Sequence, residues 1–409
     1  MLPRILISIF CLCMLSACVN STPNIPAADS PVSDGPSAPR FVPKKGKVLL
    51  ILGQDLDATA DYVNSGFFPT PGGITTYLSF YNMTGPSFPA YGALGQDIEG
   101  NALALSVDWG AGPLNAHRAA IDNPDSALVI GMGIAEGSGN TIWASGGLAN
   151  IGVGAHDDNI RRLARFCKSI GKPVYLRIAY EFDGAWNLGY EKKSSYIYAY
   201  RRIVDVMREE GVKNVAYVWQ ASASPIDDII DGRRENIRDW YPGDDYVDWM
   251  GLSWFLPPDE MPVNVATQRQ LADELLGFAR AKNKPVMIAE STPGRYDLEL
   301  LTKRNSGPLW DGEAGSEAVD KTADEIWQEW FVPFFAYIHN NSDVIRAAAY
   351  INADWDSQDS WSAPYHQGYW GDSRLQVNAD IRRHWLSEVS NDLFWLHGDR
   401  DLVDRLTDW

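Results

Sequence analysis

The chain has 409 residues, of which 45% are hydrophobic and 22% charged, and its formal net charge at pH 7 is −18. A chain of this length and apolar content can bury the core of one large domain. The strong negative charge disfavours nucleic acid and anionic lipid headgroups as partners, because both are themselves negatively charged.

The first residues predict a lipoprotein signal peptide over residues 1–17. Arg4 gives a positively charged start, and the apolar run Ile5–Leu15 is too short for a membrane-spanning helix. Leu15–Ala17 then precede Cys18 in the pattern of a bacterial lipobox, in which the cysteine thiol is acylated and becomes the mature N-terminus. The alternative is an ordinary signal peptide with an incidental cysteine.

Residues 18–45 predict a disordered tether, because they are rich in Ser, Pro, Ala and Asp and offer little to bury. We therefore expect a protein of the bacterial cell envelope that meets the membrane only through lipid on Cys18, facing the periplasm or the exterior. Val19, rather than Asp, follows the cysteine, as in lipoproteins sorted to the outer membrane. After the leader only Cys167 remains, so no intrachain disulfide is expected in the domain over residues 46–409.

Eight short apolar runs follow along the chain, separated by longer segments. Continuous apolar runs of this length are typical of a parallel sheet that is covered on its outer face. The runs are Lys47–Leu52, Ala102–Trp109, Ala127–Ile134, Pro173–Tyr180, Asn214–Trp219, Val247–Trp254, Pro285–Glu290 and Ala347–Ala353.

Several of the intervening segments carry apolar residues at helical spacing. The clearest are Asp157–Ile170, Ser194–Glu210, Gln268–Lys282 and Thr322–Asn340. Eight strand–helix units over about 340 residues predict an α/β fold, a single (β/α)8 TIM barrel. The tail Asp380–Trp409 is predicted to be helical and to pack on the outside of the barrel.

Two glutamates end predicted strands, where the active site of such a barrel lies. Glu181 follows the fourth run and Glu290 ends the seventh, so both should reach the same opening from opposite sides. Breaking a glycosidic bond requires one carboxylic acid that protonates the leaving oxygen and one carboxylate that meets the positive charge developing on carbon. The alternative is that each carboxylate caps the helix that follows it.

The motifs around both glutamates resemble those of glycoside hydrolase family 26. The family pattern Arg-Pro-x-His-Glu-x-Asn-Gly-x-Trp is matched at Arg177, Glu181, Gly184 and Trp186. The sixth-strand pattern is matched over residues 240–252, and Lys-Pro-x-x-x-x-Glu ends at Glu290. The resemblance covers roughly residues 46–385. It implies a retaining, endo-acting glycosidase with Glu181 as acid/base and Glu290 as nucleophile, acting on mannan, β-1,3-xylan, β-glucan or an algal glycan.

The chain departs from the family pattern at several cleft positions. Tyr180 stands in place of the histidine before the acid, and Asp183 in place of the asparagine two residues after it. Ser253 and Phe255 occupy positions where the sixth strand often carries Asp and Tyr. A mannan specificity therefore does not follow from the resemblance.

Residues near the strand ends are the candidates for binding substrate. Arg177 lies on the same strand face as Glu181 and is predicted to pair with Glu290; the alternative is a purely structural ion pair. The chain has 16 Trp, and aromatic rings near strand ends can stack on sugars or simply pack in the core. The substrate-binding candidates are Arg177, Tyr180, Trp186, Trp219, Trp254 and Trp355, and weaker candidates after the eighth run are Asp354, Asp356 and His366.

Two other functions remain as alternatives. A barrel that binds surface glycans without catalysis would keep the aromatic residues but need not keep both glutamates. A magnesium-dependent phosphatase of the haloacid-dehalogenase type is suggested by Asp55-x-Asp57-x-Thr59 after the first run. The sequence offers no zinc motif, phosphate loop or dinucleotide fingerprint, so we expect no metal and no cofactor. The expected partner is a polysaccharide, and we expect a monomer.

Overall fold

The computed structural model describes residues 38–83, 92–136, 147–230, 232, 234–259, 265–304, 317–365 and 368–407. The predicted signal peptide, Cys18, Val19 and His366 lie outside these ranges. Within them, no helix is long and apolar enough to cross a membrane.

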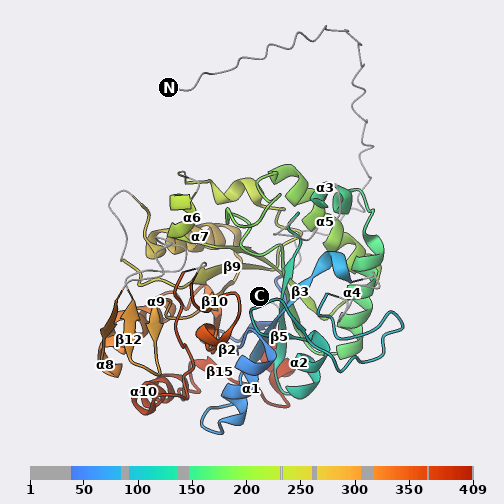
Figure 1. The fold of residues 1–409 in the computed structure, drawn as a ribbon. Helices are drawn as coiled ribbons and strands as arrows, with labels where there is room; N and C mark the ends of the chain where they lie inside the picture. The colour runs from blue at the N-terminus through green and yellow to red at the C-terminus, as the bar shows by residue number, and fades with distance from the viewer. Residues whose placement is uncertain are drawn as a thin grey trace, which may run out of the picture. The chain divides into compact units, whose positions relative to one another are not determined.

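Eight parallel strands form a closed barrel, and their order around the barrel is their order in the chain (Figure 1). The last strand pairs with the first and closes the ring. The predicted TIM barrel is therefore confirmed. Its strands are β2 (Val48–Leu52), β3 (Gly73–Ser79), β6 (Ala127–Gly133), β7 (Val174–Ile178), β8 (Val215–Ala221), β9 (Trp249–Trp254), β10 (Val286–Ser291) and β14 (Ile345–Tyr350).

The second barrel strand is not the one predicted. Most of the run Ala102–Trp109 is irregular. Ala102 forms a single bridge with Gln96, and β4 (Val107–Asp108) pairs with β5 (Pro113–Leu114), outside the barrel sheet. Gly73–Ser79 takes its place as β3, although glycine, threonine and serine make up more than half of that strand. Thr75 and Thr76 are both buried in it. β-Branched threonine suits a strand, but a search for apolar runs passes over it.

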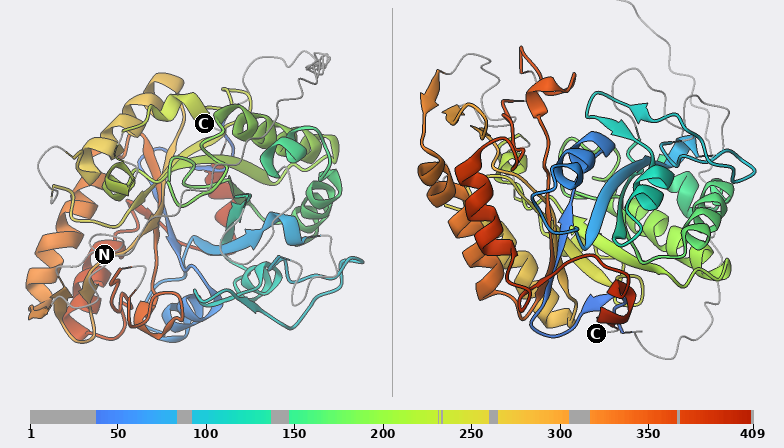
Figure 2. Two further views of the ribbon diagram at one scale, coloured as in Figure 1. Left: turned by 45° about the horizontal axis from the view of Figure 1, so that its top comes forward. Right: turned by 90° about the horizontal axis from the view of Figure 1, so that it is seen from below.

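Helices cover the outside of the barrel, as the two views of Figure 2 show. The four predicted helices are present as α4 (Asp157–Ile170), α5 (Lys193–Glu209), α7 (Gln268–Lys282) and the pair α8 (Ala323–Ile326) and α9 (Val332–Asn340), joined by a π-helical turn. Gly171 ends α4 with φ of +65°, which glycine adopts without strain. The shorter helices are α1 (Leu56–Asn64), α2 (Ala116–Asp122), α3 (Gly147–Gly152) and α6 (Pro225–Ile230).

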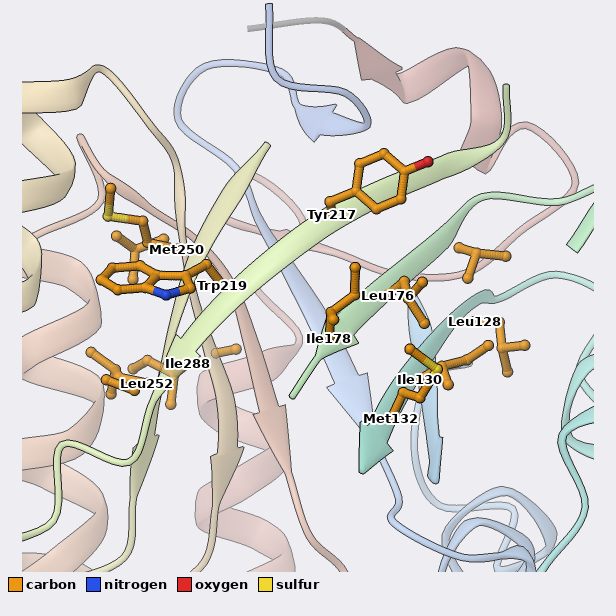
Figure 3. Close-up of a cluster of buried hydrophobic side chains, with 14 of the residues drawn as sticks. Leu128, Ile130, Met132, Leu176, Ile178, Tyr217, Trp219, Met250, Leu252 and Ile288 are labelled. Atoms are coloured by element: carbon orange, nitrogen blue, oxygen red, sulfur yellow. The ribbon is translucent and has the colours of Figure 1, made fainter. Parts of the chain in front are cut away.

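Alternating side chains along each strand form two cores. In β8, Ala216 and Val218 belong to the core inside the barrel, whereas Tyr217 and Trp219 belong to the larger core between strands and helices. Figure 3 shows part of this outer core, with Trp219 and the outward-facing residues of neighbouring strands. The side-chain period of two therefore decides which residues can reach the inner channel.

The two ends of the described chain close the N-terminal end of the barrel. After α10 (Ala379–Val389), β15 (Trp395–Leu396) pairs with the start of β2. After α11 (Leu402–Arg405), β16 (Leu406–Thr407) pairs with β1 (Val42–Pro43). The prediction of a helical tail on the outside is thus only partly right, because this tail also seals the inner core. The tether prediction is wrong for residues 38–45, in which Val42 is buried.

Candidate active site

A cleft of about 1000 Å³ lies at the C-terminal ends of the barrel strands. Glu181 and Glu290 both line it, and both side chains are largely buried. The residues that line it around them include Gln54, Tyr77, Tyr180 and Trp186. The closed barrel therefore brings together two carboxylates that lie more than a hundred positions apart in the sequence.

Glu181 lies three residues beyond the end of β7 in a strained backbone. Ala179 and Glu181 both have left-handed φ values, of +49° and +52°. This conformation is uncommon for residues other than glycine and costs free energy, so the surroundings must hold it. Asn187 does so in part, because its side-chain amide donates to the Glu181 carbonyl oxygen at 2.8 Å.

Glu290 reaches the cleft through an irregularity in β10. Met287 and Ala289 face the inner core, so strict alternation would point the side chain of residue 290 outward. The register between β10 and β9 shifts between Ile288 and Glu290, however, so that Ile288 pairs with Leu252 and Glu290 pairs with Ser253. An extra residue of this kind re-aims the side chains beyond it.

Arg177 on β7 holds Glu290 in place. Its guanidinium donates to Glu290 Oε1 at 2.7 Å and to the Ala289 carbonyl oxygen at 2.9 Å, and the side chain is fully buried. The rings of Tyr77 and Tyr180 lie 5.1 and 4.9 Å from the guanidinium carbon, where they stabilise its positive charge. The predicted pairing of Arg177 with Glu290 is confirmed.

The carboxyl group of Glu181 has different partners. Ser253 Oγ donates to its Oε1 at 2.7 Å, and Trp186 Nε1 donates to its Oε2 at 3.0 Å. Burial is the main cause that raises the pKa of Glu181, and the negative charge of Glu290 is the second. The two hydrogen bonds lower this pKa but do not offset these effects, so it lies at about 8. Glu181 is therefore protonated at neutral pH.

Gln220 on β8 lies between these two sets of partners. Its side-chain nitrogen lies 3.1 Å from Ser253 Oγ and 3.5 Å from Glu290 Oε1. Sequence reasoning missed this residue. The signal was a single polar residue within the apolar strand Val215–Ala221, two positions after the inward-facing Val218.

Comparisons with known proteins identify the family of this chain. Residues 152–326 match the model of glycosyl hydrolase family 26. The chain is 37% identical over 365 residues to the β-1,3-xylanase TXYA of a Vibrio species, covering 88% of this chain and 68% of that protein. It is also 37% identical over 372 residues to a β-1,3-xylanase of an Alcaligenes species, covering 90% of this chain and 68% of that one. The chain belongs to glycoside hydrolase family 26.

Solved structures support the same fold. A family 26 β-mannanase from Bacteroides ovatus superposes with a TM-score of 0.50 at 15% identity, covering 88% of this chain and 93% of that one. A modular endo-β-1,4-mannanase from Cellulomonas fimi gives a TM-score of 0.50 at 14% identity, covering 88% and 73%. These two structures show the fold, whereas the family membership confirms the prediction of an endo-acting glycoside hydrolase and implies a polysaccharide substrate.

Two of the four tryptophans predicted to bind sugar do not reach the cleft of this family 26 enzyme. Trp219 and Trp254 are fully buried in the outer core. Trp219 stacks on Phe182 at 4.4 Å between centroids, and Trp254 packs against Tyr337 at 4.8 Å. The prediction is wrong for both, because alternation along β8 and β9 points them toward the helices.

Trp186 and Trp355 do line the cleft. Trp186 is 36% exposed, so its ring is available to a ligand. Trp355 is almost fully buried, and its ring stacks on that of Trp370 with 4.8 Å between centroids. Sequence reasoning missed further aromatic and polar residues of this wall, among them Tyr77, Trp109, Trp361, Trp370 and Gln54.

The remaining predicted residues fall into different places. Tyr180 and Phe255 line the cleft. Asp183 does not; its carboxylate accepts a backbone hydrogen bond from Ser222 and so holds the loop after β8. Asp354 lies 3.6 Å from Arg374 in an ion pair, and neither Asp354 nor Asp356 lines the cleft.

Asp55 has a structural role in this fold. Its Oδ1 accepts hydrogen bonds from the backbone amides of Asp57 and Ala58 and so caps the N-terminus of α1. The preceding strand is the first of an eight-stranded barrel. The phosphatase alternative is therefore wrong. Among the described residues, no group of three or more His, Cys, Asp or Glu side chains is arranged to hold a metal ion.

Proposed function

We propose that Glu181 is the acid/base and Glu290 the nucleophile of a retaining double displacement. The observation that carries this assignment is the unequal pairing of two carboxyl groups in one cleft. Glu290 is held by a buried arginine, whereas Glu181 is buried with neutral donors and takes up a proton, with a pKa of about 8. The two steps of the reaction need this difference between a charged and a protonated carboxyl group.

The hydrogen bonds also assign a task to each oxygen of Glu290. Arg177 and Gln220 both contact Oε1. Among the described residues, Oε2 has no hydrogen-bond partner, so it is the oxygen free to attack the sugar carbon. Glu181 protonates the leaving oxygen in that step. It then removes a proton from the water that cleaves the glycosyl–enzyme intermediate.

For the substrate, we propose a β-1,3-linked xylan cut within the chain. The support is that two β-1,3-xylanases align over most of this chain at 37% identity. In addition, Tyr180, Ser253 and Phe255 depart from the general family 26 pattern, so membership of the family does not by itself imply a mannan substrate. A cleft lined by several aromatic side chains suits a run of sugar rings.

A polysaccharide panel tests the substrate. Purified enzyme is incubated with β-1,3-xylan, β-1,4-xylan, β-mannan and mixed-linkage β-glucan, and products are sized over time. We expect oligosaccharides of several lengths from β-1,3-xylan at early times. Faster release from β-mannan, the substrate class of the structural neighbours, would overturn the substrate proposal.

Glu290→Gln tests the catalytic assignment. The variant keeps the size of the side chain but removes the nucleophilic charge, so we expect kcat to fall by several orders of magnitude. Binding of the polysaccharide in an affinity gel should remain. Unchanged sugar release by the variant would exclude the mechanism, and binding without any release by the wild-type chain would favour the non-catalytic alternative.

We further propose that the enzyme is anchored to the cell envelope by lipid on Cys18, with the outer membrane favoured. The lipobox before Cys18 supports this proposal. Metabolic labelling with a radioactive fatty acid should mark the wild-type chain and not Cys18→Ala. Equal labelling of both would overturn it.

A further inference from the structure

A chain of buried hydrogen bonds joins the two glutamates through Gln220 and Ser253. Gln220 Nε2 donates to Ser253 Oγ and lies near Glu290 Oε1, and Ser253 Oγ donates to Glu181 Oε1. Gln220 and Ser253 are at most 1% exposed, so water does not compete for these bonds. The two residues come from neighbouring strands, β8 and β9, and both face the inner channel.

The direction of each bond follows from the charges. If Gln220 were turned over, its carbonyl oxygen would face the carboxylate of Glu290, which is repulsive. Its amide nitrogen must therefore point toward Glu290 and Ser253. Because that nitrogen can only donate, Ser253 Oγ accepts from it and has its single proton free for Glu181 Oε1.

We propose that Gln220 and Ser253 are positioning residues that keep Glu181 Oε1 an acceptor and so place the catalytic proton of Glu181 on Oε2. If the proton were on Oε1, the Ser253 hydroxyl would have no acceptor among the described residues, which is costly for a buried group. On Oε2 the proton lies beside Trp186, whose indole nitrogen only donates. This inference rests on the proposed acid/base role of Glu181.

The other groups around Glu181 do not fix the proton in this way. They act on Glu181 through their charge, whereas among the described residues its carboxyl oxygens accept hydrogen bonds only from Ser253 and Trp186. The charged or titratable groups are Glu290 on β10, Asp183 on its own loop, Arg177 on β7, Tyr77 on β3, Tyr180 and Tyr190. Ser253→Ala leaves all of them in place.

The test compares two substrates that need the acid to different degrees. One is the polysaccharide, and the other is a dinitrophenyl glycoside of the oligosaccharide released from it, whose leaving group needs no proton. For Ser253→Ala we expect kcat/KM on the polysaccharide to fall about tenfold or more, a part of the roughly 100- to 10,000-fold that acid–base catalysis contributes. On the dinitrophenyl glycoside kcat/KM should stay within about twofold of wild type.

The pH profile gives a second readout. The Ser253 hydrogen bond lowers the pKa of Glu181, so its removal should move the alkaline limb of kcat/KM to higher pH. Ser253→Thr, which keeps the hydroxyl, should restore the wild-type profile. Gln220→Met should reduce kcat/KM on both substrates, because Gln220 also contacts Glu290.

Controls separate failure of this inference from failure of the proposed function. Ser126→Ala removes another buried hydroxyl, which donates to the Pro71 carbonyl oxygen at the opposite end of the barrel. This variant should leave kcat/KM on both substrates, and its pH profile, unchanged. Glu181→Ala should abolish action on the polysaccharide; retained activity would overturn the acid/base assignment itself. The positioning role of Ser253 is overturned by a different result: Glu181→Ala is inactive on the polysaccharide, but Ser253→Ala lowers kcat/KM equally on both substrates and does not shift the alkaline limb of the pH profile.

Discussion

At the scale of single residues, the two glutamates differ because of their neighbours. A buried guanidinium contacts Glu290, whereas Glu181 is surrounded by a hydroxyl, an indole and the charge of Glu290. The same side-chain chemistry therefore gives one carboxyl group that is paired with a buried cation and one whose pKa is raised by its surroundings.

The raised pKa of Glu181 predicts how stability depends on pH. Its pKa is about 8 in the folded protein and 4.5 ordinarily, so the folded state holds the proton more tightly than the unfolded chain. The stability from this proton is fully present below about pH 4.5 and is lost as pH rises through 8. In Glu181→Gln the side chain at this position does not titrate, so the variant does not lose this stabilisation as pH rises. The melting temperature of the variant relative to that of wild type should therefore increase from pH 5 to pH 9.

Differential scanning fluorimetry across that pH range measures the difference. Glu299→Gln, an exposed glutamate outside the cleft, serves as a control and should show a flatter dependence. A difference that stays constant for Glu181→Gln, or that decreases with pH, would contradict the raised pKa.

At the scale of the strand, neighbouring residues have opposite roles. Trp219 and Gln220 are adjacent on β8, yet the tryptophan packs under the helices and the glutamine faces the inside of the barrel, where it contacts Glu290. Trp254 and Ser253 on β9 repeat this arrangement. A position at the end of a strand is therefore not enough to predict that an aromatic ring binds sugar. The face of the strand on which the ring lies must also be known.

Alanine substitutions of two tryptophans should separate these roles. Trp219→Ala removes a fully buried ring and should lower the free energy of unfolding by about 3–5 kcal/mol, with KM unchanged at temperatures where the variant is folded. Trp186→Ala removes a partly exposed ring that donates to Glu181, so it should reduce kcat/KM with a smaller loss of stability. Urea unfolding and polysaccharide kinetics measure both effects, and a raised KM for Trp219→Ala at unchanged stability would be contrary to this account.

At the scale of the molecule, the barrel depends on segments far from its active site. Arg346 on β14 is buried and donates to the backbone carbonyl oxygens of Pro43, Lys44 and Lys47. Val42 contributes to the inner core together with residues from the C-terminal tail. The folded domain therefore begins before the position at which composition alone would place its boundary.

Two truncations test where the domain begins. A chain that starts at residue 38 should have the melting temperature and activity of one that starts at residue 19. A chain that starts at residue 46 removes β1 and two acceptors of Arg346, so it should lose several kcal/mol of stability. Equal thermal melting of the two shorter chains would show that residues 38–45 do not support the barrel.

The sequence by itself determined the barrel, because alternating apolar runs and helical segments need only local periodicity. It also indicated Glu181, Glu290 and Arg177 as candidates for the site, since strand ends and motif spacing can be read along one chain. Only the tertiary structure decided the rest. The register shift before Glu290, the threonine-rich second strand, the contacts of Gln220 and Ser253, and the pairing of β1 with β16 all depend on neighbours distant in sequence. Local patterns carry no information on such neighbours, because closing the barrel is what brings them into contact.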